Sequence, residues 1–204
     1  MSAASKDTYH HGDLRTELLA QAPEMIGVEG LEKFTLRALA RRIGVTHGAV
    51  YRHFSDKREL LVALALIGHA EFSQTLQSAA SLDEDVEASI MAVARAYVRW
   101  SFAHDSHYQI MFGPRLNEDD RHPELEVAIE KTFCAVDGLF GRGSFSKARR
   151  RDLAVSLMTQ LHGYCDLVRL RRIRVRGDKA AETYLMKSIR PLVRGICAEM
   201  SLPK

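Results

Sequence analysis

Residues 34–54 read Phe34-Thr-Leu-Arg-Ala-Leu-Ala-Arg-Arg-Ile-Gly-Val-Thr-His-Gly-Ala-Val-Tyr-Arg-His-Phe54, two short helical patterns separated by a glycine. In the first pattern the apolar residues recur at the spacing of one buried helix face, namely Leu36, Leu39, Ala40 and Ile43. Gly44 suits the left-handed backbone that ends a helix tightly, and the hydroxyls of Thr35 and Thr46 are placed to cap the two helices. The stretch therefore predicts a helix-turn-helix.

The second helix of this motif carries two kinds of side chain. Val50 and Phe54 are expected to face the core, whereas the outer side or the N-terminal end carries His47, Ala49, Tyr51, Arg52 and His53. Gly48 is small, as is the alanine after it, so the backbone there would allow the close approach of a phosphate.

Basic side chains dominate the same region. Between residues 33 and 58 the one acid, Asp56, stands against Lys33, Arg37, Arg41, Arg42, Arg52, Lys57 and Arg58, whereas the net charge of the whole chain is +3. A basic surface around a small helix is expected of a protein that binds duplex DNA. The arginines alone would suit the solvated face of an amphipathic helix, but recognition helices follow such a glycine turn, which favours DNA binding.

Several short motifs resemble one known family. They are Tyr9-His-His-Gly-Asp-Leu-Arg15, Thr35-Leu-Arg-Ala-Leu-Ala-Arg-Arg-Ile-Gly-Val-Thr46, Ala49-Val-Tyr-Arg-His-Phe54, Asp56-Lys57 and Leu60-Leu61. Together they resemble the DNA-binding domain of the TetR family of transcriptional regulators. Farther along, Tyr108-Gln-Ile-Met-Phe-Gly-Pro114 and Leu161-His-Gly163 are faintly similar to the ligand-binding domain named for a Trp-His-Gly signature, although Met158 and Thr159, and no tryptophan, precede His162.

The resemblance implies an all-α fold with two domains. Residues 1–60 would form a three-helix DNA-binding domain with the helix-turn-helix, and a long helix would join it, near residues 60–65, to a helical ligand-binding and dimerisation domain over residues 61–204. The expected function is that of a homodimeric transcriptional regulator. It would be a repressor that binds a near-palindromic operator in double-stranded DNA and leaves it when a small apolar or amphipathic ligand binds.

The expected DNA contacts fall into two groups. Phosphates would be held by Thr35, Arg37, Thr46, Tyr51, His53 and Lys57, of which the family resemblance itself implies the lysine. His47, Gly48 and Ala49 lie where base edges are read. The resemblance also places residues 9–12 near the DNA backbone, and the alternative for that segment is a frayed tail.

The remaining patterns are helical, and no strand pattern appears. They run from residue 13 to the glycines at 27 and 30, from 55 through 76, and over 84–103, 105–112, 123–140, 146–173 and 179–200. Pro23 removes a backbone hydrogen bond, so a local kink is expected in the first helix. The last two helices are expected to form a four-helix bundle with a twofold mate through Leu153, Leu157, Leu161, Leu170, Leu185, Ile189, Leu192, Val193 and Ile196.

The C-terminal half is rich in large, soft side chains, which suit a small-molecule pocket and serve equally in plain core packing. The candidate ligand-binding residues are Trp100, His104, Tyr108, Met111, Phe133, Met158, His162 and Cys165. His104 and His107 have a spacing found in metal sites, but no acid or cysteine completes a ligand set. Neither a metal nor a cofactor is therefore expected.

Composition and the missing motifs argue against a membrane protein, a disulfide-rich protein and an enzyme. No apolar run approaches membrane-spanning length and no secretion signal begins the chain, so a cytoplasmic protein with no membrane association is expected. The three cysteines, Cys134, Cys165 and Cys197, lie in apolar helical patterns and are interpreted as reduced core residues. Enzyme signatures such as a phosphate-binding glycine loop or a nucleophile elbow are missing, so no enzymatic activity is expected.

Three alternatives stand beside these interpretations. The basic run over residues 169–176 is interpreted as the end of a helix, where cations suit the helix dipole and their stems cover apolar neighbours, in preference to a second nucleic-acid or membrane surface. The alternative to a repressor is a small-molecule-binding or sequestering helical protein with a vestigial helix-turn-helix. A further alternative is an adaptor that binds a protein partner through the basic helix end.

Overall fold

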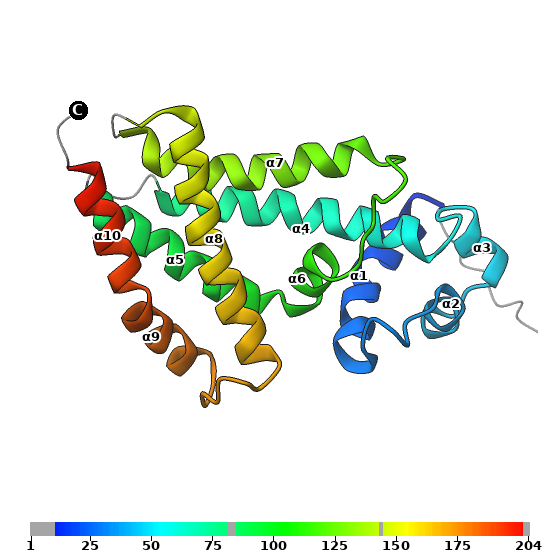
Figure 1. Ribbon diagram of the computed structural model, residues 1–204. Coiled ribbons are helices and arrows are strands. Elements are labelled where there is room, and N and C mark those ends of the chain that lie inside the picture. Colours follow the sequence, from blue (N-terminus) through cyan, green and yellow to red (C-terminus); the bar gives the residue numbers. More distant parts are fainter. Residues whose placement is uncertain (1–10, 81–84, 143–144, 202–204) are drawn as a thin grey trace, which may run out of the picture. The chain divides into compact units, whose positions relative to one another are not determined.

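The computed structural model describes residues 11–80, 85–142 and 145–201, and every regular element in those ranges is helical (Figure 1). The α-helices are α1 (His11–Glu29), α2 (Leu36–Ile43), α3 (His47–Tyr51), α4 (Lys57–Ala80), α5 (Val86–Ala103), α6 (Asp105–Phe112), α7 (Pro123–Asp137), α8 (Lys147–Arg169), α9 (Asp178–Ser188) and α10 (Arg190–Met200), with a 3-10 helix, η1 (Gly138–Arg142), before α8. The predicted all-α fold is confirmed. In the described ranges no helix has the length and apolar character that crossing a membrane requires.

The chain divides into two compact units, and each is built from two separate stretches of sequence. The first unit extends to Ile67 and takes up the chain again at Ser106–His122, while the second holds Gly68–Asp105 and the chain from Pro123 onward. The division falls inside α4 between Ile67 and Gly68, whereas the sequence placed it near residues 60–65. Residues 106–122, which we assigned to the C-terminal domain, pack with the first unit.

One face of α1 lies in the core of the first unit. Its buried residues are Leu14, Leu18, Ala22, Met25 and Ile26, as the helical pattern predicts. The helix continues without interruption through Pro23 and ends at Glu29. Gly30 has a φ of 87° and donates its N–H to the carbonyl of Ile26, so Gly30 ends the helix and Gly27 lies within it.

Two further helices contribute to the first unit. Asp56 accepts a hydrogen bond from the backbone N–H of Glu59 at 2.9 Å, which caps the start of α4. α6 lies directly against α1, since a Cβ atom added to Gly27 would come within 3.0 Å of the Ser106 hydroxyl. Tyr108 of α6 is fully buried.

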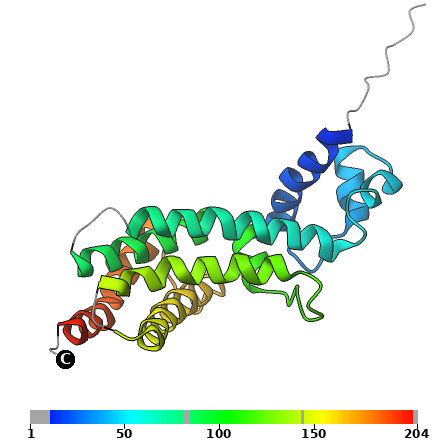
Figure 2. The ribbon, with the colours of Figure 1, turned by 90° about the horizontal axis from the view of Figure 1, so that it is seen from above.

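In the second unit α5 is the central helix and packs against α8, α9 and α10. α7 packs on α8 and runs alongside the second half of α4 (Figures 1 and 2). The buried imidazole of His69 in α4 lies with its Nδ1 3.1 Å from the hydroxyl of Thr132 in α7, which links these two helices through a polar contact.

Three of the predicted helices end earlier than their patterns suggested. α7 stops at Asp137 and is followed by η1, α8 stops at Arg169, and the helix expected over residues 179–200 is two helices. Pro191 accounts for the last difference, because it lacks an N–H and occupies the first turn of α10, where no intrahelical donor is needed.

The leucine-rich faces of the last helices pack inside their own subunit. Of the residues expected to cover a partner, those already buried in this single chain are Leu153, Leu157, Leu161, Leu185, Ile189, Val193 and Ile196. Leu192 is half-buried, and Leu170, just beyond α8, is exposed. The selection of the seven buried residues as partner surface is wrong, because a helical pattern identifies an apolar face without identifying the element that covers it. A partner contact of Leu170 and Leu192 stays a prediction.

Candidate nucleic-acid interface

Both helices of the helix-turn-helix begin at the predicted threonine caps. The hydroxyl of Thr35 accepts a hydrogen bond from the N–H of Ala38 at 3.1 Å, and that of Thr46 accepts one from Ala49 at 3.3 Å. Between them Gly44 has a φ of 78°, the left-handed conformation predicted from the sequence. In this conformation the backbone N–H groups after α2 donate hydrogen bonds to the last carbonyl oxygens of that helix. The chain then turns directly into α3.

Two apolar side chains anchor α3 to the first unit. Val50 is fully buried and Phe54, just beyond the helix, is nearly so. The guanidinium carbon of Arg15 in α1 lies 5.2 Å from the centre of the Phe54 ring, which adds a cation–π contact. Because α3 has five residues, its stability depends on these contacts more than on helix propensity.

The opposite side of α3 faces solvent. His47, Gly48 and Tyr51 are exposed, and Ala49 and His53 are half-buried. The rings of His47 and Tyr51 lie one turn apart with their centroids separated by 4.3 Å. A Cβ atom added to Gly48 would meet no other atom within 4 Å. The helix therefore presents an imidazole, a phenol and uncovered backbone to a partner.

The arginines around this surface fall into two groups. In the part of the chain that the structure describes, no ion pair holds Arg37 or Arg41 of α2, or Arg52 after α3, and all three are exposed. Arg42 is instead bound to α1, where the carboxylate of Glu24 lies 3.2 Å away. The basic surface is thus smaller than the sequence suggested.

Lys57, an expected phosphate contact, makes contacts within the first unit. Its Nζ donates a hydrogen bond to the carbonyl oxygen of Leu31 at 2.7 Å and lies 5.8 Å from the centre of the Phe34 ring. Partial burial lowers the pKa of this lysine. Its contact with DNA remains a prediction.

Arg58, the next residue, binds the loop that follows α6. Its guanidinium binds both carboxylate oxygens of Asp119, and its Nε donates to the carbonyl oxygen of Leu116 at 2.7 Å. These hydrogen bonds hold the pKa of Asp119 well below its usual range. His122 at the end of the loop lies 3.5 Å from the carboxylate of Glu59. The start of α4 is therefore attached to a segment far along the chain.

Two family models match the chain in separate places. The model described as bacterial regulatory proteins of the tetR family matches residues 18–64, and that of the tetracyclin repressor-like C-terminal domain matches residues 90–186. The chain belongs to the TetR family. The resemblance predicted from the motifs is confirmed.

Curated relatives of this TetR family chain carry the names of regulators and repressors. The chain is 30% identical to the tetracycline repressor protein class C of Escherichia coli, over 71% of this chain and 62% of that protein. It is 31% identical to the HTH-type transcriptional regulator Rv1816 of Mycobacterium tuberculosis, over 41% of this chain and 37% of that protein. The chain thus spans less than two thirds of the length of these relatives.

Solved structures share the fold. A protein of unknown function from Rhodococcus sp. RHA1 superposes with a TM-score of 0.73 at 25% identity, over 93% of this chain and 98% of the other. The TetR family regulator PfmR from Thermus thermophilus gives a TM-score of 0.69 at 16% identity, over 88% and 95% of the two chains. The helical arrangement is therefore that of the family.

The eight candidate ligand-binding residues are divided between the two units. Tyr108 and Met111 of α6 belong to the first unit, and the other six belong to the second. Trp100 and His104 line an open groove of about 700 Å³ between α4 and α5, with Gln74 at its α4 side. The rings of Trp100 and His104 stack at 4.8 Å with 17° between their planes.

Two of the candidates on α8 face α5. The Nδ1 atom of His162 lies 3.5 Å from the hydroxyl of Tyr97, and its Nε2 lies 3.2 Å from the carboxylate of Asp166. The buried thiol of Cys165 lies 3.1 Å from the hydroxyl of Ser101, and burial raises the pKa of this thiol to about 11. The contacts with Tyr97 and Ser101 link the two helices.

The remaining candidates lie elsewhere in the second unit. Met158 of α8 is buried. Phe133 of α7 is half-buried, and the guanidinium carbon of Arg151 in α8 lies 4.4 Å from the centre of its ring. Sequence reasoning missed Phe72 of α4, whose ring packs on Trp100 with centroids 4.6 Å apart. The signal was available, since Phe72 and His69 continue the apolar stripe of α4.

The cysteines differ from their predicted environment. All three are free, but of the three only Cys165 is buried, while Cys134 is exposed and Cys197 is half-buried. The expectation of core positions is wrong for Cys134 and Cys197. Cys134 stands two residues from the buried Thr132 and Val136, which places it on the opposite side of α7. Among the described residues no group of three or more histidine, cysteine or acidic side chains is placed to hold a metal ion.

The basic run over residues 169–176 begins at a helix end, as interpreted, but most of it lies outside the helix. Arg169, the last residue of α8, is bound to Asp105 at 2.6 Å and to Asp166 at 3.2 Å. The following arginines are exposed in the connection to α9, where Arg171 has a φ of 55°. The interpretation is therefore correct for Arg169 and wrong for the arginines beyond it.

Proposed function

We propose that this chain is a ligand-responsive, DNA-binding transcriptional repressor that acts in the cytoplasm as a homodimer and has no enzymatic activity. The observation that carries the proposal is the exposed side of α3, which is capped by Thr46, anchored by Val50 and flanked by exposed arginines that no ion pair holds among the described residues. Such a helix fits the major groove of duplex DNA.

The docking model assigns separate tasks to the residues of this surface. His47, Gly48 and Ala49, in the first turn of α3, read base edges. Phosphates are held by Thr35, Arg37, Thr46, Tyr51, His53 and Lys57. Phosphate contacts supply affinity and fix orientation, while base contacts supply sequence preference. A recognition helix reads few base pairs, so two copies on a near-palindromic operator supply the remaining specificity.

The second unit supplies ligand binding and dimerisation in this proposal. The groove beside Trp100 and His104 accepts a small apolar or amphipathic molecule, because an indole and an imidazole form one wall and polar side chains of α4 form the other. Dimerisation uses side chains that α8 and α9 leave exposed, including Val155, Leu167 and Tyr184.

The first experiment is selection of genomic DNA fragments by the purified full chain at near-physiological salt. Retention of a few fragments that contain inverted half-sites is expected, and Tyr51→Ala should abolish it. Val28→Ala, a change at an exposed side chain of α1, is the matched control and should leave the selected fragments unchanged.

The opposite result would favour the alternative function. If binding were weak, independent of sequence and equal for the two variants, the helix-turn-helix would be vestigial and a small-molecule-binding or sequestering role would replace the repressor. The chain has one tryptophan, so the fluorescence of Trp100 measures ligand binding in the α4–α5 groove without DNA. The two functions are thereby tested separately.

A further inference from the structure

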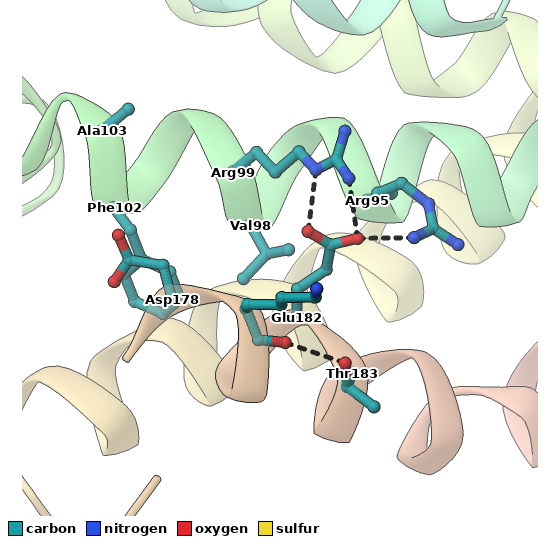
Figure 3. A pocket seen from close by; sticks show the side chains of 9 residues that line it. Arg95, Val98, Arg99, Phe102, Ala103, Asp178, Glu182 and Thr183 are labelled. Carbon is teal, nitrogen blue, oxygen red and sulfur yellow. Dashed lines mark hydrogen bonds and ion pairs between the residues drawn. The ribbon is translucent and has the colours of Figure 1, made fainter. Parts of the chain in front are cut away.

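A second cleft, of about 530 Å³, lies between α5 and α9 and is separate from the Trp100 groove (Figure 3). Val98, Phe102 and Ala103 of α5 supply its apolar wall. Four of its charged residues lie toward two ends: Arg95, Arg99 and Glu182 form a cluster at one end, and Asp178 lies toward the Phe102 end (Figure 3). The cleft therefore has a polarity along its length.

At the arginine end, one carboxylate is shared by two guanidinium groups. Glu182 accepts hydrogen bonds from Nε of Arg99 at 2.7 Å and from Nη2 at 3.1 Å, and Arg95 donates to the same carboxylate (Figure 3). These hydrogen bonds lower the pKa of Glu182, so this acid is ionised at neutral pH. Two positive charges face one negative charge, and a net positive charge remains.

α9 supplies a third cation to the cleft. Lys179 lines the same cleft, and in the part of the chain that the structure describes it has no ion-pair partner. The carboxylate of Asp178, the first residue of α9, lies at the positive end of the helix dipole, so the helix start adds no unbalanced positive charge.

We propose that this cleft binds a small amphipathic anion, a carboxylate or a phosphate monoester on a short apolar body. The anionic head lies at Arg95, Arg99 and Lys179, and the apolar body covers Val98 and Phe102. Glu182 is an internal substitute for the head group, since its carboxylate forms the forked hydrogen bonds that a ligand carboxylate would form with the same guanidinium group. Binding exchanges one carboxylate for another at the arginines.

Asp178 determines the orientation of the ligand. Its carboxylate would repel an anionic head at the Phe102 end, so the head is restricted to the arginine end. This site requires neither DNA nor the Trp100 groove. Its test therefore does not depend on the repressor function, and either proposal can fail alone.

The test uses isothermal titration calorimetry on the purified full chain with three probes that share one apolar body. They are 4-phenylbutyrate, 4-phenylbutylphosphonate and 4-phenylbutylamine, and the relative affinities of the first two distinguish a carboxylate from a phosphate-type head. Both anions should bind and the amine should not. Glu182→Gln should tighten 4-phenylbutyrate binding about five-fold, because it removes the competing charge.

A pair of variants on α9 separates a specific site from general attraction. Lys179→Gln should weaken 4-phenylbutyrate binding roughly three-fold, the effect of losing one exposed charge contact. Lys187→Gln removes the same charge from the same helix. Lys187 lines a neighbouring groove, which Lys179 also borders, but it does not line this cleft, so the change should have no effect. Both lysines are exposed, and neither change is expected to disturb folding.

Four results would overturn the proposal. The first is equal weakening by Lys179→Gln and Lys187→Gln. The second is unchanged or weaker 4-phenylbutyrate binding by Glu182→Gln. The third is preferential binding of the amine, which Asp178→Asn then abolishes. Absence of heat with either anion up to about 10 mM, in wild type and in Glu182→Gln, would overturn it as well.

Discussion

Arg58 in the first turn of α4 binds the carboxylate of Asp119, 61 residues farther along the chain, and the carbonyl oxygen of Leu116 beside it. The loop after α6 is therefore held by the helix that follows the helix-turn-helix. Because the pKa of Asp119 is lowered, this ion pair persists at neutral pH and is lost only as the pH falls through that lowered value.

Arg58→Leu should release this loop. We expect faster amide hydrogen exchange over residues 113–122, because the change removes both the ion pair and the bond to the Leu116 carbonyl. Arg115→Gln is the control, since it removes a charge from the loop that pairs locally with Glu118. Equal exchange in wild type and Arg58→Leu would show that the arginine does not anchor the loop.

Gly44→Ala and Gly48→Ala should differ in their effect on stability. Gly44 has a φ of 78°, where a Cβ atom costs about 1–2 kcal/mol, so this change should lower the free energy of unfolding by that amount. Gly48 lies in α3 with open space around it, so alanine should be neutral or stabilising by up to about 1 kcal/mol. Urea denaturation followed by circular dichroism measures both, and equal effects would contradict the assigned turn.

Arg37→Gln should weaken binding to every DNA sequence. The plot of log affinity against log salt concentration should become shallower by about 0.9, the effect of one lost phosphate contact. Arg42→Gln removes the same charge from α2, but this arginine is bound to Glu24, so a smaller change in slope is expected. Matching slopes for the two variants would refute the assigned phosphate contact.

His47→Ala should alter the choice of sequence and leave the salt dependence almost unchanged. The imidazole lies in the exposed first turn of α3, where the docking model places base contacts. Binding to an operator library before and after the change is the measurement. An unaltered ranking of sequences with unaltered affinity would remove His47 from the interface.

His69→Gln should flatten the loss of stability in acid. Burial lowers the pKa of His69 from 6.5 to about 4, so the folded chain holds a neutral imidazole while the unfolded chain binds a proton below pH 6.5. The contribution of His69 to the free energy of unfolding is therefore complete above pH 6.5 and is lost as the pH falls toward 4. The loss is at most about 3 kcal/mol. Denaturation at several pH values tests this, with the exposed His47→Gln as control. Parallel pH profiles for wild type and His69→Gln would contradict it.

The local features of the first unit were predictable from the sequence. Thr35, Gly44 and Thr46 act within a few residues of their own positions, so a cap or a left-handed turn follows from residue type and spacing alone. The apolar face of α1 was predictable for the same reason. The contacts of Lys57 and Arg58 were not, because their partners, Leu31 and Asp119, are distant in sequence.

In the second unit, helical periodicity predicted which residues are buried but not which element covers them. A helical stripe such as Leu153, Leu157 and Leu161 predicts burial correctly but does not distinguish a neighbouring helix from a second subunit. The candidate ligand-binding residues were likewise chosen by residue type, as large, soft side chains. Residue type does not show which of them lie together, and Tyr108 lies in a different unit from Trp100. The cleft between α5 and α9 depends on charges from helices that are far apart in sequence, so no local motif indicated it.

The return of the chain to the first unit at residues 106–122 affects how the protein is made. Synthesis proceeds from the N-terminus, so α1 to α3 leave the ribosome well before α6, which packs on α1, and before Asp119, which binds Arg58. The first unit cannot complete its packing until translation has passed His122. By then only Gly68–Asp105 of the second unit has been synthesised, so the first unit can complete its packing before most of the second unit leaves the ribosome.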